Sequence, residues 1–160
     1  GLGAIGKEVS IIMSNLGLEV YVFDILIDKA FLLNNPKIKE STLFKLVEMS
    51  DYISIHLPLT DQTKNLIDKD LINRMKSEVV IINTARGELI NKNNIISGLK
   101  LGKIRGYLCD VLDEEPIKPN EDLLNKNGVI ITPHVGSRTL ENISKQGLKS
   151  VENLIWSIND

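Results

Sequence analysis

Residues 1–6 of the chain are Gly1-Leu2-Gly3-Ala4-Ile5-Gly6, a G-x-G-x-x-G pattern that is followed by an expected helix over residues 7–16. In proteins that bind dinucleotides, this pattern forms the turn between a buried strand and a helix whose N-terminus faces a pyrophosphate. We expect Gly1 to permit the tight turn, Gly3 to let the backbone approach the phosphates, and Gly6 to permit close packing of the helix on the strand.

The backbone N–H groups of Ala4 and Ile5 are expected to point at the pyrophosphate, because they would lie at the N-terminus of that helix. A buried strand should lead into such a turn, yet the sequence supplies no residues ahead of Gly1. We therefore expect the chain to be a fragment that lacks the first strand of its sheet. The alternative is a nucleotide-binding module that is complete as it stands.

Strand-like and helix-like segments alternate along the rest of the chain. Short runs rich in β-branched residues are typical of buried strands, and the apolar residues between them recur at helical spacing. This alternation predicts an α/β fold of the Rossmann type, a doubly wound parallel sheet with helices on both faces, here without its first strand. Expected strands cover residues 19–23, 52–56, 79–83, 104–110 and 129–132, and expected helices cover 42–49, 69–75, 91–101 and 139–158.

Local signals mark two helix starts and one long loop. Ser41 and Asn91 each stand just ahead of an expected helix, where their side chains can cap the first turn. Residues 113–127 are polar, contain two prolines and have weak periodicity, so we expect a surface loop near a functional site. Cys109 lies in an expected strand and is interpreted as a buried residue without a redox role.

Asp24 strengthens the dinucleotide interpretation. It follows the expected strand 19–23 and lies about twenty residues after the glycine turn, where an acidic residue accepts hydrogen bonds from the adenosine ribose. A carboxylate at this place also repels a 2′-phosphate, so it favours NAD over NADP. The alternative is a glycine-rich turn followed by an unrelated aspartate at a strand end.

Composition narrows the class of protein. The 160 residues are 42% apolar and 25% charged, which is typical of a soluble globular domain. The formal net charge of −2 gives no basic field for nucleic acid, and no segment resembles a signal peptide or a membrane span. With one cysteine there is no disulfide framework and no thiolate metal cluster, so we expect a cytoplasmic protein without a metal site.

Three ionisable residues follow expected strands: Arg86, Glu115 and His134. The carboxyl ends of parallel strands open onto one crevice, so these side chains should share a site. Hydride transfer to a 2-keto acid needs a planar cation for the substrate carboxylate, which arginine supplies, and a proton donor for the carbonyl oxygen, which histidine supplies. A glutamate partner would orient the imidazole and favour its protonated form.

Each of these residues also has a simpler interpretation. Arg86 could be a surface residue of a turn, Glu115 could belong to a solvated acidic stretch, and His134 after a proline could be an ordinary loop histidine. Their joint placement at strand ends around one crevice favours the catalytic interpretation. His56, also at a strand end, is interpreted as a residue near the cofactor ribose or its loop, not as an acid or base.

Several longer stretches resemble one family in the same order along the chain. The sequence resembles the D-isomer-specific 2-hydroxyacid dehydrogenases, of the phosphoglycerate dehydrogenase-like kind, over essentially all 160 residues. The stretches that carry the resemblance are GLGAIG (1–6), SDYISIHLPLT (50–60), VIINTARG (80–87), DV (110–111) with EEP (114–116), and TPHVG (132–136).

The resemblance implies a role for each strand-end residue: Arg86 as the substrate clamp, Glu115 as the histidine partner and His134 as the acid/base. It places Asp110 near the nicotinamide, where a carboxylate favours the oxidised ring. Related formate dehydrogenases carry glutamine in place of this glutamate, which argues against formate as a substrate. The implied cofactor contacts, beyond Gly1, Gly3 and Gly6 of the turn, are Ala4, Ile5, Asp24, Leu57, Pro58, Thr84, Ala85, Arg86, Asp110, His134 and Gly136.

The family also has a second domain, built from both chain ends, that covers the substrate. We therefore interpret residues 1–138 as an NAD-binding domain that is truncated at its N-terminus. Residues 139–160 are interpreted as a long helix leading back toward the substrate domain. The resemblance further suggests a homodimer formed through the NAD-binding domain.

The leading functional hypothesis is an NAD-dependent oxidoreductase that transfers a hydride between NAD(H) and a D-2-hydroxy acid/2-keto acid pair. Candidate substrates are 3-phosphoglycerate, hydroxypyruvate or glycerate, glyoxylate and D-lactate. The alternative is an NAD-sensing binding protein like the transcriptional corepressors that share this fold, which can retain the same arginine, glutamate and histidine. As a fragment, the 160-residue chain alone is expected to be inactive.

Overall fold

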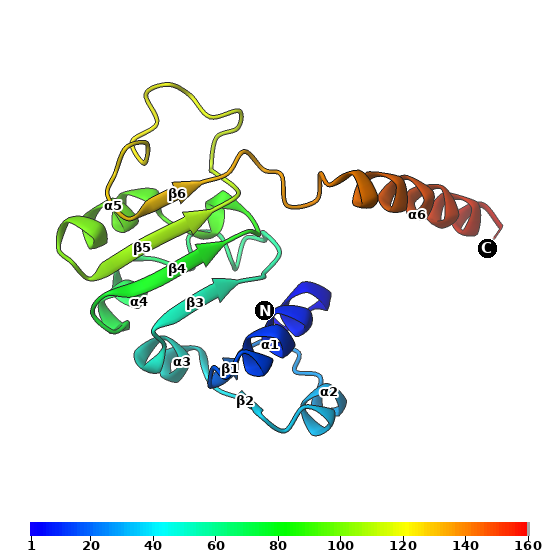
Figure 1. Ribbon diagram of the computed structural model, residues 1–160, viewed down its shortest axis with the longest axis horizontal. Coiled ribbons are helices and arrows are strands. Elements are labelled where there is room, and N and C mark those ends of the chain that lie inside the picture. Colours follow the sequence, from blue (N-terminus) through cyan, green and yellow to red (C-terminus); the bar gives the residue numbers. More distant parts are fainter. Residues whose placement is uncertain (160) are drawn as a thin grey trace.

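The computed structural model describes residues 1–159 and has an α/β fold in which every strand pair is parallel. Four strands form the main sheet in the order β3-β4-β5-β6 (Figure 1). Their bounds are Tyr52–Ile55, Val79–Asn83, Ile104–Cys109 and Val129–Ile131. The Rossmann-type interpretation is confirmed in the residues that are described.

Helices pack on this sheet through a continuous apolar core. Ile81 of β4 and Ile95 of α5 (Lys92–Lys100) are completely buried in that core. α3 (Leu43–Met49) and α4 (Lys69–Arg74) pack against each other and supply further apolar side chains to the same core. Cys109 of β5 is buried as expected, and burial raises the pKa of its thiol to about 11, which keeps the thiol protonated and unreactive.

A smaller parallel pair lies beside the main sheet. β1 (Val20–Val22) pairs with β2 (Ile38–Glu40), and α1 (Ala4–Asn15) and α2 (Lys29–Asn34) lie next to them. The sequence did not predict α2 or β2. Both are short, and β2 has a single buried residue, so neither leaves a periodic apolar pattern.

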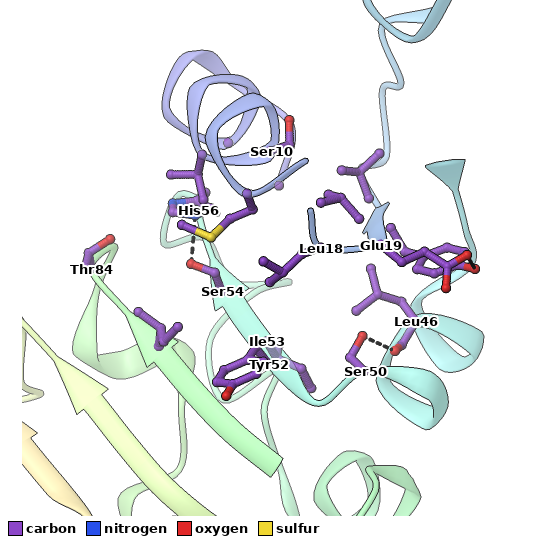
Figure 2. A pocket seen from close by; sticks show the side chains of 18 residues that line it. Ser10, Leu18, Glu19, Leu46, Ser50, Tyr52, Ile53, Ser54, His56 and Thr84 are labelled. Atoms are coloured by element: carbon purple, nitrogen blue, oxygen red, sulfur yellow. Dashed lines mark hydrogen bonds between the residues drawn. The ribbon is translucent and has the colours of Figure 1, made fainter. Parts of the chain in front are cut away.

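An apolar groove separates the two sheets. β1 pairs only with β2, and β3 pairs only with β4 among residues 1–159, so each has one strand edge without a neighbour. The space between them is a cavity of about 490 Å³ (Figure 2). Its walls come from α1, β1, α3, β3 and the end of β4, namely Gly1, Gly6, Val9, Ser10, Met13, Leu18, Glu19, Val20, Tyr21, Val22, Leu46, Ser50, Tyr52, Ile53, Ser54, His56, Ile82 and Thr84.

One of the two expected caps is wrong. Asn91 caps α5 through its side chain, which accepts from the N–H of Asn94 at 3.3 Å. Ser41 does not cap α3. Its N–H donates to the carbonyl of Val22 at the end of β1, and this contact holds Ser41 one residue ahead of the helix cap. Thr42 caps α3 instead, accepting from the N–H of Lys45 at 3.3 Å.

α6 (Leu140–Asn159) extends away from the sheets (Figure 1). It corresponds to the long helix expected over 139–160, of which Asp160 lies outside the described residues. Its apolar side chains are exposed along the helix, including Leu148, Leu154 and Trp156. Within residues 1–159, no helix is both long and apolar enough to cross a membrane. The expected loop 113–127 is confirmed, since it contains no helix or strand.

Candidate active site

Three neighbouring strands end beside one another and carry the expected catalytic side chains. Asn83 of β4 pairs with Cys109 of β5, and Cys109 pairs with Ile131 of β6. The segments that leave these three strand ends contain Arg86, Glu115 and His134, respectively. The parallel sheet therefore brings the three segments to one edge, as the sequence predicted.

Glu115 and His134 are in direct contact. His134 Nδ1 lies 2.7 Å from Glu115 Oε2, and the other carboxylate oxygen of Glu115 accepts from the N–H of Leu112 at 2.9 Å. The contacts with His134 and Leu112 lower the pKa of Glu115 below its usual value. Glu115 is therefore ionised at neutral pH, and its negative charge is lost as the pH falls through that lowered pKa.

The backbone of His134 adopts an unusual conformation. Its φ angle is +53°, in the left-handed region that non-glycine residues seldom adopt. Its N–H donates to Thr132 at 3.0 Å, which closes a tight turn directly after β6. Such strained residues are concentrated at functional sites, and here the turn directs the imidazole toward the loop that carries Glu115.

Asp110, at the end of β5, holds this turn in place. One carboxylate oxygen accepts from Thr132 Oγ1 at 2.5 Å and from the N–H of Val135 at 3.0 Å, and the other accepts from the N–H of Gly136 at 2.8 Å. Burial alone would raise the pKa of Asp110, but these hydrogen bonds outweigh it and keep the pKa below its usual value. Asp110 thus links β5 to the segment that contains His134.

Arg86 lies in an exposed turn after β4. Its Nη1 donates to the carbonyl of the preceding Ala85 at 2.6 Å, and within residues 1–159 no ion pair engages its guanidinium. Asn83, which is fully buried, supports the turn: its side chain donates to the carbonyl of Arg86 at 2.8 Å and accepts from the N–H of Ala85 at 3.0 Å. Sequence reasoning missed Asn83, although a polar residue closing an apolar strand was a signal.

Gly87 joins the Arg86 turn to the loop that carries Glu115. A Cβ atom placed on Gly87 would lie 2.0 Å from the carbonyl carbon of Leu112, so only glycine permits this approach. The turn that contains Arg86 and the loop that contains Glu115 therefore pack directly against each other through their backbones.

The N-terminus of α1 has the features expected of a pyrophosphate site. Gly3 is its N-cap, and no side chain caps the helix or places an acid in its first turn. The first backbone N–H groups of the helix, which include those of Ala4 and Ile5, are therefore open to an anion. Gly1 and Gly6 are required by packing, because a Cβ on Gly6 would lie 2.1 Å from the carbonyl oxygen of Gly1.

Asp24 lies beside this turn. It accepts from the N–H of Leu2 at 2.7 Å and from the N–H of Leu26 at 3.0 Å. Burial alone would raise the pKa of Asp24, but these hydrogen bonds outweigh it and keep the pKa below its usual value. The carboxylate therefore stays charged next to the helix N-terminus, which fits an NAD ribose site.

The remaining expected cofactor residues lie around the same sheet edge. Thr84 lines the groove together with His56, which is not one of these expected contacts (Figure 2). Leu57 and Pro58 come after His56, close to the end of β3. His56 Nε2 lies 2.9 Å from Ser54 Oγ, and burial lowers the pKa of His56. All of the expected cofactor contacts remain predictions, those of the glycine turn, Asp24 and Asp110 as well as those of Leu57, Pro58, Thr84, Ala85 and Gly136. No group of acidic, histidine or cysteine side chains in residues 1–159 could hold a metal ion.

A match to a family model identifies the family of this chain. The model of the D-isomer specific 2-hydroxyacid dehydrogenase NAD-binding domain matches residues 1–136. The chain belongs to this family. The matched part of the family is its NAD-binding domain, so NAD is the cofactor, as the sequence predicted.

Several known proteins are similar to this chain over most of its length. A glyoxylate reductase of Korarchaeum cryptofilum is 33% identical over 155 residues, which are 97% of this chain and 46% of that protein. A D-3-phosphoglycerate dehydrogenase of Haemophilus influenzae is 37% identical over 145 residues, 88% of this chain and 35% of that protein. The chain thus spans half or less of the length of these relatives.

The fold matches the same family. The crystal structure of a D-lactate dehydrogenase of Aquifex aeolicus in complex with NAD and lactic acid has a TM-score of 0.82 and 28% identity to this chain, covering 98% of it and 52% of that protein. The similar proteins named here are reductases and dehydrogenases, so they give no support to the NAD-sensing alternative.

Proposed function

We propose that the complete protein is an NAD-dependent dehydrogenase that interconverts a D-2-hydroxy acid and a 2-keto acid. The contact that carries this proposal is the 2.7 Å pair between His134 Nδ1 and Glu115 Oε2 at the carboxyl edge of the sheet. This pair leaves the other ring nitrogen of His134 to exchange a proton with a substrate oxygen. Bound NADH supplies the hydride for reduction of the carbonyl carbon.

The chain's own residues account for binding and proton transfer. Arg86, whose exposed guanidinium engages no carboxylate in residues 1–159, binds the substrate carboxylate with two parallel hydrogen bonds. His134 donates a proton to the carbonyl oxygen during reduction and accepts it back during oxidation. Glu115 orients the ring and stabilises the imidazolium form.

Two features would hold the cofactor. The uncapped N-terminus of α1, with open space in front of Gly3, accommodates the pyrophosphate. Asp24 would accept hydrogen bonds from the adenosine ribose and exclude a 2′-phosphate. We therefore assign NAD, and not NADP, as the preferred cofactor of the complete protein.

For the substrate we propose glyoxylate, hydroxypyruvate or 3-phosphohydroxypyruvate with their hydroxy-acid partners. The names of the relatives support this group, and Arg86 would recognise the carboxylate that all of these acids share. The test is the rate of NADH oxidation by the complete protein with each acid. Turnover of at least one of them supports the function, and no turnover with any short 2-keto acid would contradict it.

We also propose that an extended segment preceding Gly1 fills the groove between β1 and β3. The nitrogen of Gly1 is part-buried and donates to the carbonyl of Phe23 at 2.9 Å, so the chain enters at the end of the groove. Both flanking strands offer an unpaired edge, and the lining is mostly apolar. A parallel strand there would join the two sheets into one of seven strands in the order 3-2-1-4-5-6-7, which contains the order 3-2-1-4-5-6 that is common in dinucleotide-binding folds.

Filling the groove should stabilise the domain strongly. Burial of about three apolar side chains contributes on the order of 5 kcal/mol, which raises the Tm of a chain of this size by roughly 10 °C. In the test, a segment is added ahead of Gly1. This segment is the one that precedes the glycine turn in the Korarchaeum cryptofilum relative. The control is an extension of the same length in which the apolar residues are replaced by serine. Equal Tm values for the two extended chains would refute the strand.

The second domain and the oligomer belong to the same proposal. We infer that α6 leads back to a domain that covers the substrate, that the homodimer forms through the NAD-binding domain, and that residues 1–160 alone are inactive. The exposed apolar side chains of α6 support a partner surface on this helix. Sedimentation of the complete protein should give a dimer; a monomer at micromolar concentration would contradict it.

A further inference from the structure

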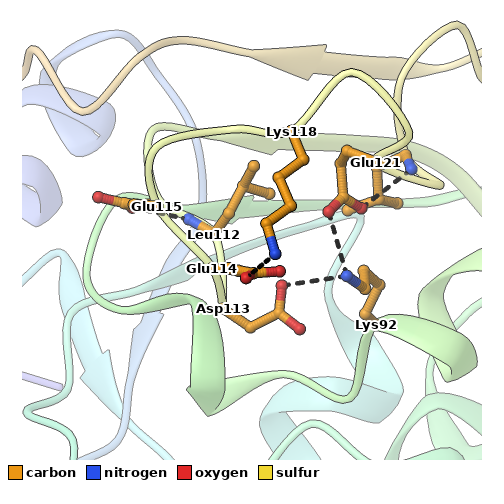
Figure 3. Close-up of polar contacts among 8 residues, drawn as sticks. Lys92, Leu112, Asp113, Glu114, Glu115, Lys118 and Glu121 are labelled. Atoms are coloured by element: carbon orange, nitrogen blue, oxygen red, sulfur yellow. Dashed lines mark hydrogen bonds and ion pairs between the residues drawn. The ribbon is translucent and has the colours of Figure 1, made fainter.

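The loop that carries Glu115 is tied to α5 by one lysine. Lys92, in the first turn of α5, donates to Asp113 Oδ1 at 3.2 Å and to Glu121 Oε2 at 3.1 Å (Figure 3). The two acceptors lie at opposite ends of segment 113–121, and Glu115 lies between them. A single ammonium group therefore brings both ends of the segment to the same point.

The ion pair between Lys92 and Glu121 is more buried than an ordinary surface ion pair. The side chain of Lys92 is 25% exposed and that of Glu121 only 7% exposed. Glu121 also accepts from the N–H of Leu123, a residue of the main core. Burial alone would lower the pKa of Lys92, but the hydrogen bonds with Glu121 and Asp113 outweigh it and raise the pKa above its usual value.

The proposed reaction depends on where this segment holds its glutamate. The side chain of Glu115 is partly exposed, and its hydrogen bonds are with His134 and the N–H of Leu112. Segment 113–121 contains no helix or strand that could fix its path. The two hydrogen bonds of Lys92 join both ends of segment 113–121 to α5, a helix that packs in the main core.

We propose that Lys92 is a positioning residue, which clasps both ends of segment 113–121 and thereby holds Glu115 in place against the histidine. This inference rests on the proposed function for its catalytic consequence. The ammonium group of Lys92 is engaged by Asp113 and Glu121, so Lys92 is assigned no contact with substrate or cofactor. It acts by keeping the carboxylate within hydrogen-bond reach of the imidazole, where small displacements reduce catalysis.

The test replaces Lys92 with methionine in the complete protein. Lys92→Met keeps the apolar stem and removes the charge, so the segment should loosen and kcat should fall by about tenfold with little change in the KM for NADH. Less support from Glu115 also disfavours the imidazolium, so the basic limb of the rate profile for keto-acid reduction should move to lower pH. Asp110, the other carboxylate near His134, stays in place in this variant.

A matched control lies in the same loop. Lys118 pairs with Glu114, but both side chains are more than half exposed, so this pair should contribute little. Lys118→Met removes the same charge and should leave kcat and the pH profile unchanged. Equal losses in the two variants, or an unshifted profile in Lys92→Met, would overturn the proposal.

A second variant separates positioning from folding. Lys92→Met leaves the buried carboxylate of Glu121 without its cation, which can destabilise the chain. The double variant Lys92→Met/Glu121→Gln removes that charge as well and should recover Tm while kcat stays low. Lys92→Arg should restore much of the activity. Recovery of full activity together with Tm in the double variant would show a merely structural role and overturn the proposal.

Failure of the proposed function can be told apart from failure of this inference. The rate of amide hydrogen exchange in segment 113–121 reports whether Lys92 holds this segment in place, and it can be measured without any turnover. Faster exchange in Lys92→Met than in Lys118→Met supports the clasp even if the complete protein reduces no keto acid. Unchanged exchange would reject the clasp whatever the activity.

Discussion

Replacement of His134 by alanine is expected to lower kcat for keto-acid reduction by about 10²–10⁴-fold in the complete protein. The imidazole contacts Glu115 through Nδ1 and is the side chain placed to donate the proton, so its removal acts on the chemical step. Steady-state rates with NADH and the best keto acid measure this loss. The Kd for NADH should change far less than kcat, because the loss concerns the transition state.

His56 supplies the control for this experiment. It is the other histidine of the chain, and it lies in the groove wall, where it contacts Ser54. His56→Asn should therefore retain most of the turnover. If His134→Ala keeps its kcat, or if the two variants lose equal activity, the acid/base assignment is wrong.

Replacement of Asp24 by asparagine should reduce the preference for NADH over NADPH by about 10²-fold. In its proposed role the carboxylate would repel a 2′-phosphate and accept hydrogen bonds from the ribose, and a hydrogen bond to a charged group contributes about 1.5–3 kcal/mol. The measured quantity is the ratio of kcat/KM for the two cofactors.

The local structure of this residue decides how the variant is designed. Asp24 also accepts from the N–H groups of Leu2 and Leu26, so a residue without an acceptor would disturb the glycine turn. Asparagine removes the charge and keeps an acceptor, and Asp24→Ala shows the cost of losing both. An unchanged cofactor ratio in the folded asparagine variant would mean that another residue reads the ribose.

The sequence predicted those elements whose packing leaves a repeating pattern. β4 reads VVIIN and is almost completely buried, so its run of β-branched residues indicated a central strand. β2 reads IKE, with one buried residue, and it forms because it pairs with β1. Nothing local to residues 38–40 distinguishes them from a loop, so only tertiary pairing could define this strand.

The same distinction applies to the site. Arg86, Glu115 and His134 follow strands, so topology alone placed them at one edge of the sheet. Lys92 instead acts through contacts with Asp113 and Glu121, which lie 21 and 29 positions further along the chain. The sequence places Lys92 in an ordinary polar first turn of a helix, and its two acidic partners become visible only once the loop is folded over α5.

The most direct test of the central claim is the configuration of the product. The complete protein, supplied with NADH and glyoxylate-like keto acids that become chiral on reduction, such as hydroxypyruvate, should oxidise NADH and release the D-2-hydroxy acid. Chromatography on a chiral column identifies the isomer. Release of the D-isomer with loss of activity in His134→Ala is the predicted result, and absence of turnover or release of the L-isomer would contradict the account.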